Sequence, residues 1–133
     1  MRMNTQANEA DNVIDNVNAP KHYTSHASGI ECIQIAELLP FNLGSALKYV
    51  WRRGLKWNES EDVQKAIFYL RRQEQLGSVP TYTVPVYEDL QDSVARIYES
   101  GDAILGEICN TIVFGEPCDW DSLADLLGSD YYE

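Results

Sequence analysis

Residues 41–54 have the sequence FNLGSALKYVWRRG, and this stretch decides the fold. Its apolar residues recur at the spacing i, i+3, i+4, i+7, i+8, which places them on one face of an α-helix. They are Leu43, Ala46, Leu47, Val50 and Trp51. Gly54 stands where a glycine commonly ends a helix. We therefore predict an amphipathic helix whose apolar stripe packs against other helices.

The segments on both sides of this stretch also predict helices. Upstream, residues 30–40 (IECIQIAELLP) place Ile30, Ile33 and Leu38 on one face, and Pro40 stops the helix. Downstream, residues 58–77 begin with Asn58 and Glu61, which resemble a capping box. The buried stripe of this downstream helix comprises Val63, Ala66, Ile67 and Leu70.

The second half of the chain predicts two or three further helices after a linker at residues 78–85 (SVPTYTVP). A break near Gly101 separates two of them. A short last helix begins at Asp119 or Asp121. The apolar positions of the first two are Leu90, Val94 and Ile97, then Ile104, Leu105, Ile108, Ile112 and Val113. The predicted fold class is all-α, a small bundle of five or six helices with an ordered N-terminal loop at residues 17–29.

Length and composition limit the domain organisation. The chain has 133 residues, of which 44% are hydrophobic, enough for a core without disulfides. We predict a flexible tail at 1–16, a domain at 17–76, and an acidic helical C-terminal extension at 77–133 that packs on it. No apolar run approaches the roughly 20 residues of a membrane span, and the N-terminus lacks the apolar core of a secretory signal. Three cysteines without metal-ligand spacing indicate free thiols in a cytoplasm.

The formal charge of −11 is unevenly distributed. Residues 21–72 hold eight Lys/Arg against five Asp/Glu, a balance of +3. Residues 73–133 hold one arginine, Arg96, against thirteen Asp/Glu, a balance of −12. The middle of the chain therefore suits an anion, and the C-terminal half repels one.

Cations and aromatic rings gather at the end of the first helix. Lys48 and Arg52 are four residues apart and share a helical face. Lys65, Tyr69 and Arg72 repeat the arrangement on the next helix at i, i+4 and i+7, so antiparallel packing would line one groove with the cations of both helices. Arginine forks hold phosphate oxygens, and rings offer a flat surface to a base. The pattern predicts a small anionic ligand such as a nucleotide, not duplex nucleic acid. A structural explanation stays open, because cations also stabilise a helix C-terminus.

Residues 17–73 resemble a small phage-encoded domain family that includes SaV-like proteins and phage nucleotide kinases. The residues that carry the resemblance fall into four blocks. They are Pro20, His22 and Tyr23; Gly29, Ile30 and Glu31; Phe41, Leu43, Gly44, Lys48, Tyr49, Arg52, Gly54 and Lys56; and Glu61, Asp62, Lys65, Ala66, Tyr69 and Leu70. The family pattern has a histidine where this chain has Ala19. His26 has no counterpart in the pattern, and we expect it at the surface.

The resemblance implies a phage protein in the cytoplasm of the infected bacterial host, similar to kinases that phosphorylate deoxynucleoside monophosphates. No G-x-x-x-x-G-K-[ST] loop is present, so side chains must hold the phosphates. We expect His22, Arg52 and Lys48 to be the catalytic residues. The expected ligand-binding residues are Tyr23, Lys48, Tyr49, Arg52, Arg53, Lys56, Lys65 and Tyr69. A Mg²⁺ cofactor would take carboxylates from Glu31, Glu61 and Asp62.

Two other interpretations stay open. The same groove would serve a protein that binds a nucleotide, or a nucleotide signal of host defence, without turnover. Alternatively, the acidic C-terminal half would bind a host protein. A chain this short suggests a homo-oligomer, because a site between subunits would enclose a nucleotide better.

Overall fold

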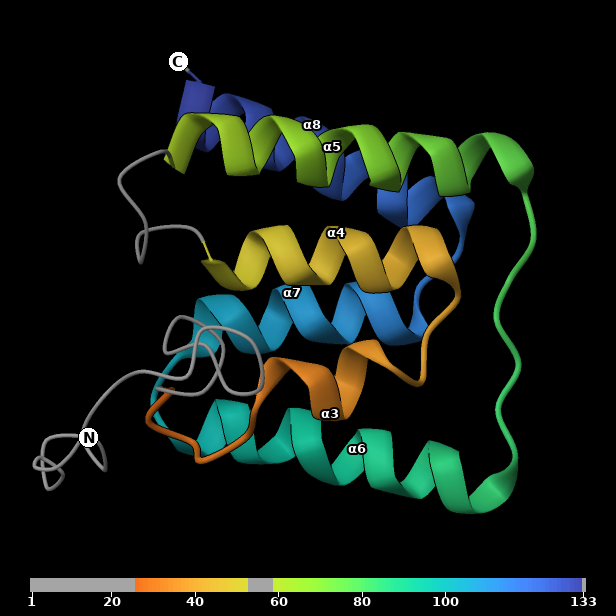
Figure 1. The fold of residues 1–133 in the computed structure, drawn as a ribbon, viewed down its shortest axis with the longest axis vertical. Coiled ribbons are helices and arrows are strands. Elements are labelled where there is room, and N and C mark those ends of the chain that lie inside the picture. Colours follow the sequence, from red (N-terminus) through yellow and green to blue (C-terminus); the bar gives the residue numbers. More distant parts are fainter. Residues whose placement is uncertain (1–25, 53–58, 133) are drawn as a thin grey trace, which may run out of the picture.

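The computed structural model of the chain describes residues 26–52 and 59–132, and these two ranges contain six α-helices and no strand (Figure 1). The predicted all-α bundle is confirmed. Its helices are α3 (Cys32–Ala36), α4 (Phe41–Arg52), α5 (Glu59–Leu76), α6 (Val84–Glu99), α7 (Ala103–Phe114) and α8 (Pro117–Tyr132). None of the helices in this part of the chain is long and apolar enough to cross a membrane.

Helix α4 lies at the centre of the bundle and contacts α3, α5 and α7 (Figure 1). Helices α5 and α8 pack together on one side of α4, and α3 and α6 lie toward the other side. The predicted stripe of α4 is buried throughout, from Leu43 to Trp51. Val63, Ala66 and Leu70 of α5 face it from the antiparallel neighbour, and Ile67 is half-buried. The 3.6-residue period of both stripes therefore fixes which faces meet.

The face predicted for α3 is wrong in part. Ile33 is 57% exposed, whereas Cys32 and Ile35 are buried. The helix ends at Ala36, before Pro40, so its five residues make little more than one turn and Cys32 and Ile35 share its buried side. Burial raises the pKa of the Cys32 thiol to about 12, and the nearby Lys48 lowers it in part.

The helices after the linker differ from the prediction in one stripe position and in where α6 begins. Leu90, Val94 and Ile97 of α6 are buried, but Ile104 of α7 is 62% exposed. Helix α6 begins at Val84, where Thr83 is the N-cap and a proline occupies the first turn, so the linker is shorter than predicted. The chain breaks at Gly101, whose φ of +98° favours glycine.

The last helix is longer than predicted and begins earlier, at Pro117. Asp119 does not start it; its carboxylate accepts a hydrogen bond from the Glu116 N–H at 3.0 Å, across the first turn. Asp121 lies inside the helix and pairs with Arg71 of α5. Asp125 pairs with the same guanidinium at 2.6 Å. Arg71 therefore joins α5 to α8.

Gly106 of α7 allows the close approach of Tyr98, and we expect Gly106→Ala to destabilise the protein by about 1–3 kcal/mol. An added Cβ would lie 2.8 Å from the Tyr98 ring, inside contact distance, and the preference of helices for alanine offsets only part of that cost. Urea unfolding followed by circular dichroism measures the change.

Gly128→Ala is the matched control for this prediction. A Cβ at Gly128 would lie 3.6 Å from Ile67, an ordinary contact, so the control is expected to be neutral or slightly stabilising. Equal effects of the two substitutions would contradict the packing argument.

Candidate functional site

Three of the predicted cations meet around one ring on the face shared by α4 and α5. The Nζ of Lys65 lies 5.3 Å from the centroid of the Tyr49 ring. The Cζ of Arg52 lies 5.6 Å from it, and the Nζ of Lys48 lies 5.9 Å from it. These distances are within the range of cation–π attraction. We call Lys48, Tyr49, Arg52, Lys65 and Tyr69 the Tyr49 cluster.

Aromatic side chains extend the Tyr49 cluster across the surface. The rings of Tyr49 and Tyr69 are parallel within 3°, with centroids 6.1 Å apart. Phe41 and Phe68 each contact Tyr69 edge to face, at 5.8 and 5.2 Å. Phe41 is 74% exposed and Phe68 is 63% exposed. The structure thus places flat apolar surface beside the cations, which is what a nucleobase and its phosphates require together.

A shallow hollow of about 260 Å³ adjoins the Tyr49 cluster. Phe41 and Lys48 line it from α4, and Glu37 and Leu39 line it from the turn after α3. Gly44 also lies in its wall, and a Cβ there would stand 2.9 Å from the carbonyl oxygen of Ala36. The absence of a side chain at Gly44 therefore lets the end of α3 approach α4.

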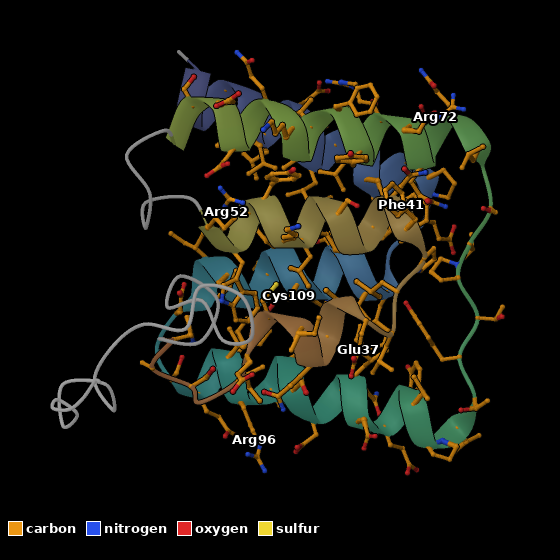
Figure 2. All side chains as sticks on the ribbon, in the orientation of Figure 1. Glu37, Phe41, Arg52, Arg72, Arg96 and Cys109 are labelled. Carbon is orange, nitrogen blue, oxygen red and sulfur yellow. The ribbon has the colours of Figure 1, made fainter. Side chains whose placement is uncertain are left out.

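Arg52 and Asp62 form an ion pair between α4 and α5. The Nε of Arg52 lies 3.7 Å from Oδ2 of Asp62, and both atoms are buried. Figure 2 shows Arg52 at the end of α4 near the start of α5, and Phe41 at the opposite end. Asp62, which the sequence predicted as a magnesium ligand, is only 3% exposed and faces a guanidinium. Its charge therefore compensates that of Arg52.

The three predicted magnesium ligands do not come together. Glu61 pairs with Lys65 at 3.7 Å on the surface of α5. Glu31 lies at the N-cap of α3, where its N–H donates to Oε1 of Gln34. Among the side chains of the two described ranges, no three His, Cys, Asp or Glu residues form a metal site. A magnesium ion held mainly by phosphate oxygens and water would need only one or two carboxylates.

The other predicted site residues are His22, Tyr23, Arg53 and Lys56, which lie outside the described residues. The predicted capping pair and C-cap also include residues outside them, Asn58 and Gly54. The prediction that Arg72 lines the same groove is wrong, because Arg72 lies at the far end of α5 from Arg52 (Figure 2). Of the predicted ligand-binding residues that the structure describes, all five are in the cluster.

The prediction for His26 is wrong, because its side chain is only 15% exposed. Its Nε2 lies 3.0 Å from Oδ2 of Asp102, the N-cap of α7, and its Nδ1 lies 2.8 Å from Oγ of Ser28. The ring also packs on Trp51 at 5.7 Å. His26 thus ties the loop before α3 to the C-terminal half. No local sequence signal pairs residues 76 positions apart, although Asp102 before an apolar run is recognisable as an N-cap.

Comparison with known proteins identifies one similar family, and it covers the segment that contains the Tyr49 cluster. A family model described as a protein of unknown function, DUF3310, matches residues 17–71, which is less than half of the chain. The chain is similar to this family over that segment, and the Tyr49 cluster lies within it. The family's description names no activity. No curated protein and no solved structure matches the chain.

Proposed function

We propose that this protein binds a nucleotide on the Tyr49 cluster, with its phosphates held by Lys48, Arg52 and Lys65. The observation that carries the proposal is the convergence of three cations on one ring, within 5.3 to 5.9 Å. A cluster formed only to stabilise the end of α4 would not need Lys65, which comes from the first half of α5. The chain collects these cations although its net charge is −11.

The charges of the cluster suit a small anion. Lys48, Arg52 and Lys65 face two carboxylates, those of Asp62 and Glu61. Phosphate oxygens would replace the exposed Glu61 as the partner of Lys65, because that pair is a surface pair with little net stability. The buried Asp62 would keep the Arg52 guanidinium in place. The exposed rings of Phe41 and Phe68 lie within reach of Tyr69 and would cover a base.

Phosphoryl transfer is the reaction that the resemblance to phage nucleotide kinases adds to this proposal. The γ-phosphoryl group of a nucleoside triphosphate would move to a phosphate oxygen of a deoxynucleoside monophosphate, giving two diphosphates. Such a reaction requires positioning and charge neutralisation more than covalent chemistry. Lys48 and Arg52 would supply the charge, and a Mg²⁺ ion bound through the phosphates would supply the rest. The setting we propose is the cytoplasm of a phage-infected bacterium.

A second copy of the chain would complete the site. Lys48 and Lys65 of the Tyr49 cluster are exposed, and Phe41 and Phe68 beside it are both mostly exposed. Large exposed apolar side chains in one patch are typical of interfaces. We therefore include a homo-oligomer in the proposal. Light scattering with and without nucleotide tests it, and a strict monomer under saturating ligand would contradict it.

Replacement of Lys48 or Lys65 by alanine is expected to weaken nucleotide binding about tenfold or more, since charge-assisted hydrogen bonds contribute roughly 1.5–3 kcal/mol each. Both side chains are exposed, so the fold should survive. Arg96→Ala is the matched control, because it also removes one exposed cation but lies on α6, away from the cluster (Figure 2). Calorimetry with each deoxynucleoside monophosphate and with ATP measures the affinity.

Turnover separates the kinase from a protein that only binds. Purified protein, Mg²⁺, ATP or dTTP, and each monophosphate are incubated, and the products are separated by ion exchange. Diphosphate that disappears in Lys48→Ala and persists in Arg96→Ala would support the kinase. Binding without product would support a non-catalytic nucleotide binder. The proposal would be overturned if the protein did not bind nucleotide. It would also be overturned if Lys48→Ala, Lys65→Ala and Arg96→Ala bound nucleotide with equal affinity.

A further inference from the structure

A second hollow lies between α6 and α7, outside the segment that matches the family model. Its volume is about 390 Å³, within the range of small-ligand pockets. Its wall holds three aromatic rings and two side-chain amides above a buried valine: Tyr87, Tyr98, Phe114, Gln91, Asn110 and Val94. We call it the α6–α7 hollow. Among the described residues, no lysine or arginine lines it.

The rings of the α6–α7 hollow are held in place by their own contacts. Tyr98 lies against Gly106, and its hydroxyl donates to Oε2 of Glu107 at 2.7 Å. Phe114 meets Tyr87 at 5.2 Å between centroids and Tyr82 at 6.5 Å. Rings fixed before binding lose little conformational freedom when a ligand arrives.

The charge of the C-terminal half, which supplies both walls of the α6–α7 hollow, favours a cation. Residues 73–133 carry thirteen acids and one arginine, a balance of −12. That arginine, Arg96, already pairs with Asp92 at 3.2 Å. Glu107 lies at the Tyr98 end of the hollow, and the amide oxygens of Gln91 and Asn110 are potential hydrogen-bond acceptors. An anionic ligand such as a nucleotide would be repelled, so this site differs from the Tyr49 cluster.

We infer that the α6–α7 hollow binds a lysine or arginine side chain from a basic segment of a protein partner. Aromatic rings attract ammonium and guanidinium groups through their negative faces. Glu107 and the other acids of the C-terminal half would steer a basic segment toward this part of the molecule. Charge complementarity favours a cationic side chain over an uncharged ring in the hollow, because an uncharged ring would gain only stacking and no attraction to the acids. The inference does not depend on nucleotide binding.

The test uses the full chain and a fluorescent nine-residue peptide with three arginines separated by glycine and serine. Anisotropy at near-physiological salt measures the affinity. Gln91→Lys adds a cation to the hollow, and Tyr87→Ala removes a half-exposed ring; each is expected to weaken binding about tenfold, as loss of a cation–π contact allows. Gln75→Lys, on the exposed surface of α5, adds the same charge elsewhere and should change the affinity less than about twofold.

Three outcomes would overturn the inference. Peptide binding could be undetectable, or equally weakened by Gln75→Lys and Gln91→Lys, which would indicate nonspecific attraction to an acidic surface. Tyr87→Ala could abolish the binding of adenosine and leave the binding of the peptide unchanged. That result would assign an uncharged ring to the hollow. Lys48→Ala should leave peptide binding unchanged, so failure here is distinct from failure of the nucleotide proposal.

Discussion

Trp120→Ala is expected to lower the free energy of unfolding by about 4 kcal/mol. Trp120 is fully buried and is the largest such side chain among the described residues. Its Nε1 donates to the carbonyl oxygen of Thr111 at 3.2 Å, which joins α8 to α7. Domains of this size are stable by only about 5–15 kcal/mol, so the variant would lose a large share of its stability. Urea unfolding followed by circular dichroism measures the loss.

Trp120→Phe is the control for this prediction. Phenylalanine keeps most of the buried ring but loses the hydrogen bond, so we expect a smaller cost of about 1–2 kcal/mol. A loss below about 1 kcal/mol for Trp120→Ala would show that α8 contributes little to the core. A loss that Trp120→Phe fully reproduces would assign the stability to the hydrogen bond.

Asp62→Ala is expected to cost about 3 kcal/mol or more, because removing one member of a buried ion pair leaves the other charge poorly compensated. The Asp62 side chain is 5% exposed, that of Arg52 is 17% exposed, and their charged atoms face each other at 3.7 Å. Urea unfolding again measures the change. Glu61→Ala is the matched control, since it removes a neighbouring acid from an exposed pair and should cost less than about 1 kcal/mol.

A double variant separates stability from function in the same pair. Replacing both charges, as Asp62→Leu with Arg52→Met, removes the need for compensation and should recover much of the lost stability. It should still lose nucleotide affinity, because Arg52 is proposed to hold phosphate. Recovery of both stability and binding would remove Arg52 from the proposed site. Equal destabilisation in Asp62→Ala and Glu61→Ala would contradict the buried pair.

The sequence alone predicted the all-α class and the apolar stripe of α4. An apolar period of 3.6 residues depends only on neighbouring residues in the chain, and it decides which face of the helix is buried. The sequence also predicted that Lys48 and Arg52 share a face, since a spacing of four residues settles that within one helix. The break at Gly101 followed from the same local chemistry. Where a helix was short, local periodicity was insufficient: α3 buries Ile35 and exposes Ile33.

The tertiary structure alone decided which residues from different helices meet. The sequence predicted Asp62 as a magnesium ligand, and the register between antiparallel α4 and α5 placed it against Arg52. His26 met Asp102, and Tyr98 met Gly106, for the same reason. Helical spacing fixes the faces of one element, but the relative shift and rotation of two elements depend on every side chain in their interface.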